Sequence, residues 1–231
     1  MASPLVVPKH AVPKRKVSGA LPLPDNTRAR LLDAAGQVFA ETGYQAATVR
    51  QICAHAGVNI ALVNYHFGDK LELYTEVLRH STGAAKNEII QKCSDAPPEE
   101  ALRVLIGAML ERVCGADRPG WHYRLMVHEL AQPTPAMAKV IDETMRPIYD
   151  RFRGLIGALL RLPADHDETR LCTHSVIAQI VHYAHSRHVN SQLWPELKLT
   201  PARIAQVARH IADFSLAYIH AAAPPRPGRK K

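Results

Sequence analysis

The chain of 231 residues has few of the features that mark secreted, membrane or metal-binding proteins. Its cysteines lie far apart and never form a C-x-x-C pair; they are Cys53, Cys93, Cys114 and Cys172. This spacing argues against a disulfide framework or a zinc knuckle and is typical of a reducing compartment. Residues 1–24 lack the sustained apolar segment of a signal peptide. The apolar run after Gly57 stops at Asn64, far short of the roughly 20 residues of a membrane span. We therefore expect a cytoplasmic protein with no membrane partner.

The sequence also lacks G-x-S-x-G, a phosphate-binding loop and H-E-x-x-H, so no motif predicts an enzyme, a cofactor or a catalytic metal. Arg124, His128 and Glu129 could indicate acid–base chemistry, but residues 124 and 128 have the spacing of an ordinary pair along one helix. Four histidines fall within fifteen positions: His174, His182, His185 and His188. Their spacing spreads them across a helix face, whereas zinc needs convergent ligands. We expect pocket or interface histidines.

The formal net charge of +8 lies entirely in the two ends of the chain. Residues 1–24 and 224–231 each carry four basic side chains and no acidic one, whereas residues 25–223 carry 21 of each sign. Both ends contain proline and cannot build a core, so we expect a disordered basic arm and a basic tail. Such blocks are often nucleic-acid-binding arms, although a solvated tail that aids solubility explains the C-terminal one about equally well.

Between these ends the chain predicts an all-α protein. No alternation of β-branched residues appears, and turn signals recur at helical spacing. After the first three helices we expect further helices at about 69–92, 98–115, 121–131, 136–162, 166–191 and 200–221. Pro147 should kink or split the 136–162 segment, because proline lacks an N–H and clashes with the preceding turn.

Residues 48–67 predict two short helices joined by a tight turn. Thr48 and Gln51 form a capping box at the start of the first helix. Gly57 and Val58 make the turn, and Asn59 can cap the second helix. Two helices joined in this way form a helix-turn-helix, which places its second helix in the major groove of DNA.

The second of these helices has an inner and an outer side. Three apolar residues are spaced to pack inward: Val58, Val63 and Phe67. Four residues then lie towards the outside: Ile60, Ala61, Asn64 and Tyr65. Asparagine can pair with adenine, and apolar side chains can touch thymine methyl groups, while Arg50, Lys70 and the basic arm can hold phosphates. From the spacing alone, the alternative that Ile60 and Tyr65 belong to the core is almost as well supported as the outward position.

Residues 27–78, "TRARLLDAAGQVFAETGYQAATVRQICAHAGVNIALVNYHFGDKLELYTEVL", resemble the N-terminal domain of TetR-family transcriptional regulators. The spacing from Gly43 through Thr48 and Gly57 to Lys70 matches throughout. The stretch "VNIALVNYHFGDK" is most similar to the CecR-like subgroup of that family.

The resemblance assigns two kinds of DNA contact. It implies that four residues contact the DNA backbone: Thr48, Tyr65, His66 and Lys70. It implies that four others can face the bases: Arg50, Ile60, Ala61 and Asn64. Two positions depart from the family pattern. Leu62 stands where a threonine is common and Asn64 where a tyrosine is common, so no backbone contact is implied at either.

The resemblance also implies a helix-turn-helix domain at 25–80 and a larger helical ligand-binding and dimerisation domain at 81–223. In the family the last two helices of each subunit form a four-helix dimer interface. The last predicted helix carries a narrow apolar seam, suited to packing against another subunit or within the monomer: Ile204, Val207, Ile211, Phe214 and Tyr218. The family's C-terminal domain encloses a small-molecule pocket. Candidate lining residues are aromatic or polar side chains on segments expected to be largely internal: Trp121, Tyr123, Arg124, His128, Met137, His182 and Tyr183.

We therefore expect a homodimeric transcriptional regulator that binds a pseudo-palindromic operator in double-stranded DNA. A small organic ligand should release it, which makes it a repressor, and that ligand must prefer the state that cannot fit DNA. One alternative is a constitutive DNA-binding regulator with no small-molecule inducer. A second is a helical enzyme or metal-binding protein that uses the helix-turn-helix as a docking module.

Overall fold

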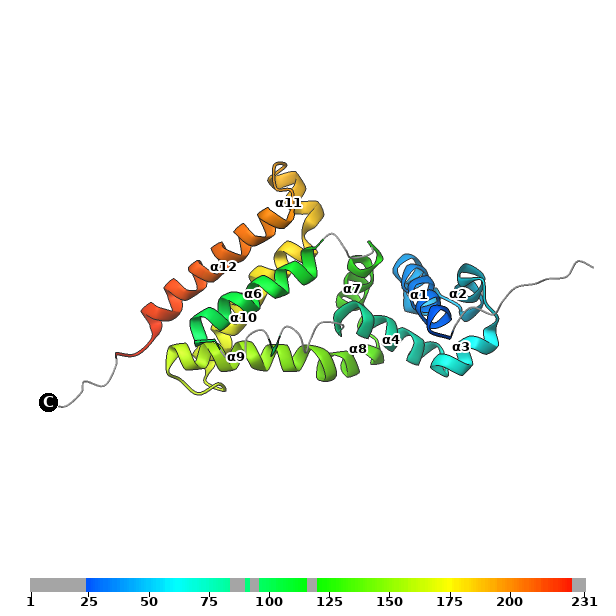
Figure 1. The fold of residues 1–231 in the computed structure, drawn as a ribbon, viewed down its shortest axis with the longest axis horizontal. Coiled ribbons are helices and arrows are strands. Elements are labelled where there is room, and N and C mark those ends of the chain that lie inside the picture. The colour runs from blue at the N-terminus through cyan, green and yellow to red at the C-terminus, as the bar shows by residue number, and fades with distance from the viewer. Residues whose placement is uncertain (1–23, 84–89, 92–95, 116–119, 226–231) are drawn as a thin grey trace, which may run out of the picture.

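The computed structural model describes residues 24–83, 90–91, 96–115 and 120–225, which form helices and connecting turns without a strand (Figure 1). The helices are α1 (Pro24–Ala46), α2 (Val49–Ala56), α3 (Ile60–Phe67), α4 (Lys70–Gly83), α6 (Pro98–Cys114), α7 (Trp121–Ala131), α8 (Pro135–Val140), the π-helical turn η1 (Ile141–Met145), α9 (Arg146–Leu160), α10 (Asp167–His185), α11 (Arg187–Leu193) and α12 (Pro201–Ala222). The predicted all-α class is confirmed. None of the described helices has the length and apolar character that crossing a membrane requires. The predicted basic arm and nearly all of the basic tail lie outside the described residues.

We call α1, α2, α3 and α4 the head, which lies at one end of the molecule (Figure 1). Phe39 of α1, Ile52 of α2 and Val63 of α3 are each fully buried in one apolar cluster, and Leu73 of α4 joins them. At about 1.5–3 kcal/mol for each large apolar side chain removed from water, this cluster supplies most of what holds such short helices together.

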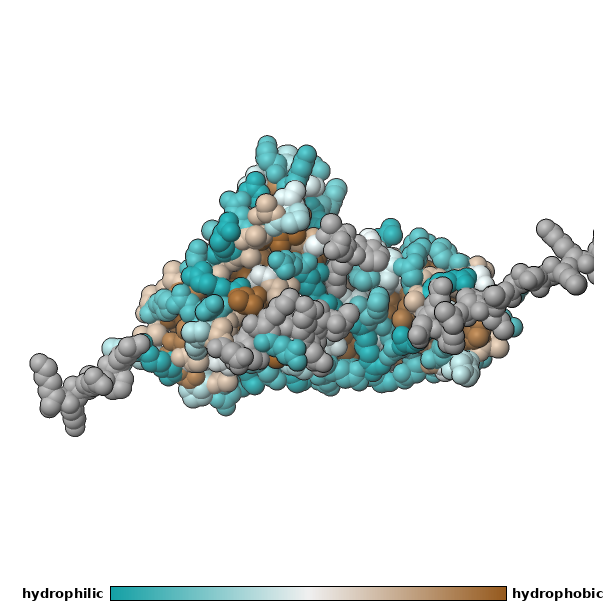
Figure 2. Space-filling model, viewed as in Figure 1, coloured by the Kyte–Doolittle hydropathy of each residue, from teal (hydrophilic) through white to brown (hydrophobic). Residues whose placement is uncertain are grey.

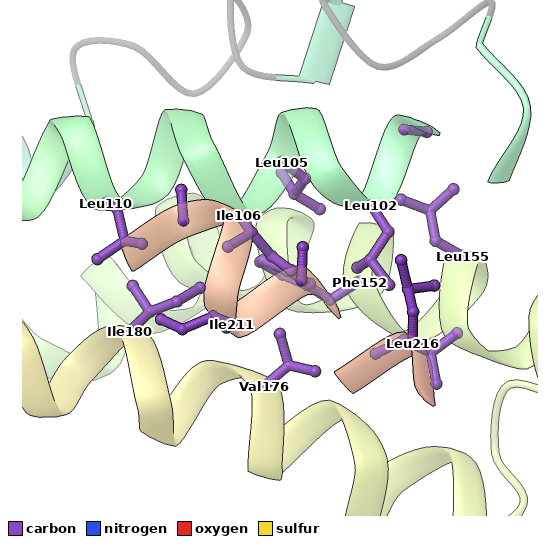
Figure 3. Close-up of a cluster of buried hydrophobic side chains, with 14 of the residues drawn as sticks. Leu102, Leu105, Ile106, Leu110, Phe152, Leu155, Val176, Ile180, Ile211 and Leu216 are labelled. Carbon is purple, nitrogen blue, oxygen red and sulfur yellow. The ribbon is translucent and has the colours of Figure 1, made fainter. Parts of the chain in front are cut away.

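We call α6, α9, α10 and α12 the body, and its core is drawn in Figure 3. Leu105 and Ile106 of α6 point towards Phe152 of α9, Ile180 of α10 and Ile211 of α12. All five side chains are buried, so the body has an apolar core of its own. Figure 2 shows hydrophilic side chains over most of the visible face, with apolar residues in separate patches.

The helices α7 and α8 connect head and body. Trp121 and Leu125 of α7, together with Met137 and Val140 of α8, are buried in the apolar cluster of the head. The head's core therefore includes side chains from beyond residue 80, where the sequence predicts the end of the helix-turn-helix domain. From α3, the helix α4 runs back towards α7 and α8 in the middle of the molecule (Figure 1).

The 136–162 segment, which Pro147 is predicted to kink or split, is divided into α8, η1 and α9. The N–H of Arg146 bonds to the carbonyl of Ile141, five residues back, so the helix widens immediately before Pro147. We attribute the widening to the proline, which has no N–H to donate and crowds the preceding turn.

The helix predicted at 166–191 ends at His185 and a new one begins at Arg187. The single-helix prediction is wrong here, because Ser186 between them has non-helical angles (φ −104°, ψ 25°). As a result His188 does not share a helix with His174, His182 and His185. Among the residues that the structure describes, no three histidine, cysteine or acidic side chains are grouped as a metal site.

Candidate DNA-binding face and ligand cavity

The turn between α2 and α3 is built by local hydrogen bonds that the sequence predicts. The N–H of Gln51 donates to Oγ1 of Thr48 over 3.2 Å, and the N–H of Thr48 donates to Oε1 of Gln51 over 2.9 Å. Gly57 ends α2 with φ 64° and ψ 40°, a left-handed conformation that strongly favours glycine. The N–H of Ala61 then donates to Oδ1 of Asn59 over 2.7 Å, which caps α3. The predicted helix-turn-helix is confirmed.

The inner and outer sides of α3 are also as predicted. Val63 and Phe67 are buried, and Val58 is half-buried against the same cluster. Tyr65 is 82% exposed and Ile60 is 46% exposed, which rules out the alternative that both belong to the core. Ala61 and Asn64 are exposed as well. The helix thus presents two apolar side chains, an amide and a phenol to solvent.

Basic and hydroxyl side chains flank this surface. Thr48 and Arg50 are exposed at the start of α2, whose first turn carries no acidic residue. Nζ of Lys70 donates to the carbonyl of Gln45 over 3.3 Å and lies 4.5 Å from the ring centre of Tyr44. Burial lowers the pKa of Lys70, but the ammonium stays near the surface in a fixed position.

The remaining predicted DNA contact, His66, is half-buried between two aromatic rings. Its ring centre lies 5.0 Å from that of Tyr65 and 6.1 Å from that of Phe67. All eight predicted DNA contacts therefore lie at the N-cap of α2, on α2, on α3 or at the start of α4. We call them the DNA-binding face: Thr48, Arg50, Ile60, Ala61, Asn64, Tyr65, His66 and Lys70.

A cavity of about 290 Å³ lies between head and body. Its wall combines residues of α4, α6, α7, η1, α9 and α10. Ser81 and Thr82 come from α4, His122 and Met126 from α7, and Thr144 from η1. Most of the remaining wall is aliphatic, aromatic or methionine, and none of the described lining residues is acidic. The cavity is thus an apolar space with a small number of polar groups, as ligand sites in proteins usually are.

Arg112 and His185 each bring a buried nitrogen to the wall of this cavity. Nη2 of Arg112 and Nδ1 of His185 are buried, and within the described part of the chain neither atom has a hydrogen-bond partner. Burial lowers the pKa of Arg112 by removing water from the guanidinium. Burial, and then the charge of Arg187, lower the pKa of His185. The hydroxyl of Tyr123 donates to the carbonyl of His185 over 2.7 Å, which connects α7 to α10 beside the cavity.

The structure brings one of the seven predicted ligand residues, Tyr123, into the cavity wall. Trp121 and Met137 are buried in the head cluster instead, and Tyr183 packs against the body core. Three others are exposed: Arg124, His128 and His182. Trp121 lies outside the cavity because of the orientation of α7 about its axis. This orientation places Trp121 and Leu125 in the head cluster and places His122, Tyr123 and Met126 in the cavity wall.

Sequence reasoning missed Arg112, His122 and the lining residues of η1 and α9. Arg112 follows the charged Glu111 near the end of α6, so its local sequence is typical of a solvated helix end and gives no signal of an inward position.

One buried and one partly buried hydrogen bond tie α7 to the head. The hydroxyl of Tyr74 in α4 donates to Oε1 of Glu129 in α7 over 2.6 Å, and both residues are 1% exposed. The indole N–H of Trp121 donates to Asp33 in α1 over 3.0 Å. Beside it, the Trp121 ring packs so closely on Gly36 that a Cβ there would lie 2.5 Å from ring carbons. A shift of α7 would therefore disturb α1 and α4.

The outer side of α10 and α12 exposes large apolar side chains. Leu171 is 63% exposed, Phe214 64% and Tyr218 56%, and all three line one shallow groove. Of the seam predicted on α12, the other three residues are buried within the monomer: Ile204, Val207 and Ile211. The seam thus divides between the body core and an exposed apolar surface, which we call the α10/α12 face and define by Leu171, Phe214 and Tyr218.

Comparison with known proteins finds two family models that match this chain. Residues 98–219 match the C-terminal domain of the HTH-type transcriptional dual regulator CecR, and residues 31–77 match the bacterial regulatory proteins of the tetR family. CecR of Shigella flexneri is 27% identical over 169 residues, which are 68% of this chain and 75% of CecR. The HTH-type transcriptional repressor Rv3405c of Mycobacterium tuberculosis is 34% identical over 132 residues, which are 56% of this chain and 64% of the repressor.

Solved structures share the fold at low sequence identity. The transcriptional regulator FadR from Bacillus subtilis, in complex with stearoyl-CoA, superposes with a TM-score of 0.63 and 17% identity. The match covers 82% of this chain and 97% of FadR.

Proposed function

Because the chain belongs to the TetR family of transcriptional regulators, with a C-terminal domain of the CecR type, we propose that it binds operator DNA as a homodimer and leaves it when a small ligand fills the cavity. It acts by binding alone, without a chemical step, and works in the cytoplasm, where its DNA is. A dimer that occupies an operator excludes other proteins from that DNA, so repression is the expected outcome. The name of Rv3405c, a repressor, supports this sign of regulation.

The position of the cavity carries this proposal. The helix α4 belongs to the head and also contributes Ser81 and Thr82 to the cavity wall. The helix α7 buries Trp121 in the head and turns Met126 to the cavity. A ligand that favours a different separation of these helices would therefore move the head, and only such a difference in affinity between two states can shift their populations. FadR, which has this fold, was solved with stearoyl-CoA, and this supports a ligand-binding use of the fold.

The DNA-binding face fits a duplex in a specific way. A helix in the major groove reads base edges with its exposed side, and here that side offers Ile60, Ala61 and Asn64. Four residues are assigned to contacts with the backbone phosphates: Thr48, Tyr65, His66 and Lys70. Arg50 adds a positive charge beside the bases. A dimer formed through the α10/α12 face would present two such heads and would require a pseudo-palindromic operator.

Substitutions on the outer side of α3 test this assignment. After the operator is selected from genomic fragments, Tyr65→Ala should weaken the binding of operator and random DNA alike, because Tyr65 is assigned to the DNA backbone. Asn64→Ala should weaken operator binding by about 1–3 kcal/mol, because Asn64 is assigned to the bases. That loss is about fivefold to 150-fold in dissociation constant at fixed salt. Leu193→Ala is a suitable control, because Leu193 is 79% exposed on α11, away from the head. Unchanged discrimination between operator and random DNA in Asn64→Ala, together with unchanged affinity in Tyr65→Ala, would reject the DNA-binding face.

A further inference from the structure

The cavity wall holds a half-buried arginine that forms no ion pair with a described acidic side chain. Arg112 is the charged residue of a wall whose described members include no acid, and its Nη2 atom is buried without a hydrogen-bond partner among them. Burial lowers its pKa, but a guanidinium keeps its proton in proteins. Removing part of a guanidinium from water without a partner is unfavourable, and a counter-ion at the buried Nη2 would offset that cost.

Resting on the proposed function, we infer that the regulatory ligand is an apolar monocarboxylate whose carboxylate pairs with Arg112. A planar guanidinium can form two parallel hydrogen bonds with a carboxylate, which fixes the orientation of the ligand as well as its charge. One guanidinium balances one negative charge, so a phosphate dianion would bring a second charge that this wall does not match. His185 lines the same cavity, and its Nδ1 has no hydrogen-bond partner among the described residues. In the tautomer that carries the proton on Nδ1, this atom can donate a hydrogen bond to a carboxylate oxygen of the ligand.

The remainder of the wall selects the body of the ligand. Ile148, Phe152, Ile177 and Ile180 offer only apolar surface. The volume of 290 Å³ equals about ten water molecules at about 30 Å³ each, so the cavity takes a body of roughly ten carbons. Within that limit each added methylene should tighten binding about fourfold, because burial of one methylene contributes a nearly constant free energy.

Paired probes separate the role of charge from that of apolar burial. Decanoate is compared with decanol, and 1-naphthoate with 1-naphthol, by calorimetric titration of the full chain. We expect each carboxylate to bind at least tenfold more tightly than its neutral partner. In Arg112→Met, carboxylate affinity should fall about tenfold to 150-fold, as for loss of a charge-assisted hydrogen bond. The affinity for the neutral partner should stay within about threefold, because its binding comes from apolar burial.

The control and a second measurement keep this test decisive. Arg103→Met changes an arginine of the same helix that bonds to Asp213 at the surface, and should leave both affinities unchanged. Arg112→Met should also raise the midpoint of urea unfolding of the free protein, because it removes a partly buried charge that has no acidic partner among the described residues. A lowered midpoint would show that Arg112 is compensated in the free protein and would overturn the inference.

The outcomes also separate this inference from the proposed function. Equal binding of carboxylate and alcohol, or no binding of either carboxylate at millimolar concentration, overturns the monocarboxylate assignment. Carboxylate binding that depends on Arg112 but does not weaken operator binding supports the ligand class and overturns release by ligand.

Discussion

Removal of the Tyr74 hydroxyl should weaken the connection between head and α7 by a measurable amount. This hydroxyl donates to Oε1 of Glu129 over 2.6 Å at a site that excludes water. Burial, followed by the hydrogen bond and charge of Glu129, raises the pKa of Tyr74. The phenol therefore stays protonated at neutral pH and can donate to Glu129.

The size of the effect follows from what Tyr74→Phe leaves in place. The ring keeps its contacts with Phe39 and Tyr44, whose centres lie 4.6 Å and 4.8 Å away. Glu129 keeps the hydrogen bonds from the N–H and hydroxyl of Thr134, at 3.1 Å and 2.9 Å. Hydrogen bonds to charged groups contribute about 1.5–3 kcal/mol. Since Glu129 remains partly satisfied, we expect a loss near the lower end, about 1.5–2 kcal/mol.

A double-mutant cycle in urea unfolding measures this contribution. The cycle is needed because neither single variant removes only this hydrogen bond. Tyr74→Phe, Glu129→Ala and the double variant should together give a coupling energy of about 1.5 kcal/mol. Tyr149→Phe is the matched control, since its hydroxyl lies 3.5 Å from the exposed His174 and should matter little. Additivity of the two single variants within about 0.5 kcal/mol would refute a direct connection between α4 and α7.

Two further substitutions test the packing of α7 and the proposed dimer. Gly36→Ala should destabilise the protein by about 1–3 kcal/mol in urea, since the added methyl overlaps the Trp121 ring. Gly154→Ala, whose added methyl meets nothing within 4 Å on an exposed helical site, should stabilise it by up to about 1 kcal/mol. Equal effects of the two would contradict the close approach of α7. Phe214→Asp should shift the protein from dimer to monomer in sedimentation, whereas Leu130→Asp, equally exposed on α7, should not.

The sequence predicts the head well because its signals are local. The capping box of Thr48 and Gln51 is decided within four residues, and Gly57 and Asn59 follow it at once. Each of these residues can be recognised without knowledge of the rest of the fold. The exposure of Tyr65 follows in turn, since the positions of Val63 and Phe67 fix which side of α3 is inward.

The cavity could not be predicted in the same way because α7 is apolar on two sides. One side meets the head through Trp121 and Leu125, and the other meets the cavity through Met126. A helical period cannot tell which apolar side faces a core and which faces a ligand site. Arg112 was missed for a related reason, since an arginine in a helix is usually on a solvated face. Only the packing of α9 and α10 around the same cavity shows that Arg112 belongs to its wall.

Two side-chain contacts connect α4 to other helices of the cavity wall, one to η1 and one to α7, and their energies differ. In the exposed contact, Nε and Nη2 of Arg79 donate to the two carboxylate oxygens of Glu143 in η1, at 2.6 Å and 2.9 Å. Both side chains are partly exposed, at 32% and 49%, so this pair should contribute at most about 1 kcal/mol and weaken with salt. In the buried contact, Tyr74 and Glu129 are shielded from solvent ions. Under the proposed function, a ligand that moved η1 and α7 would therefore disturb α4 more through its contact with α7 than through its contact with η1.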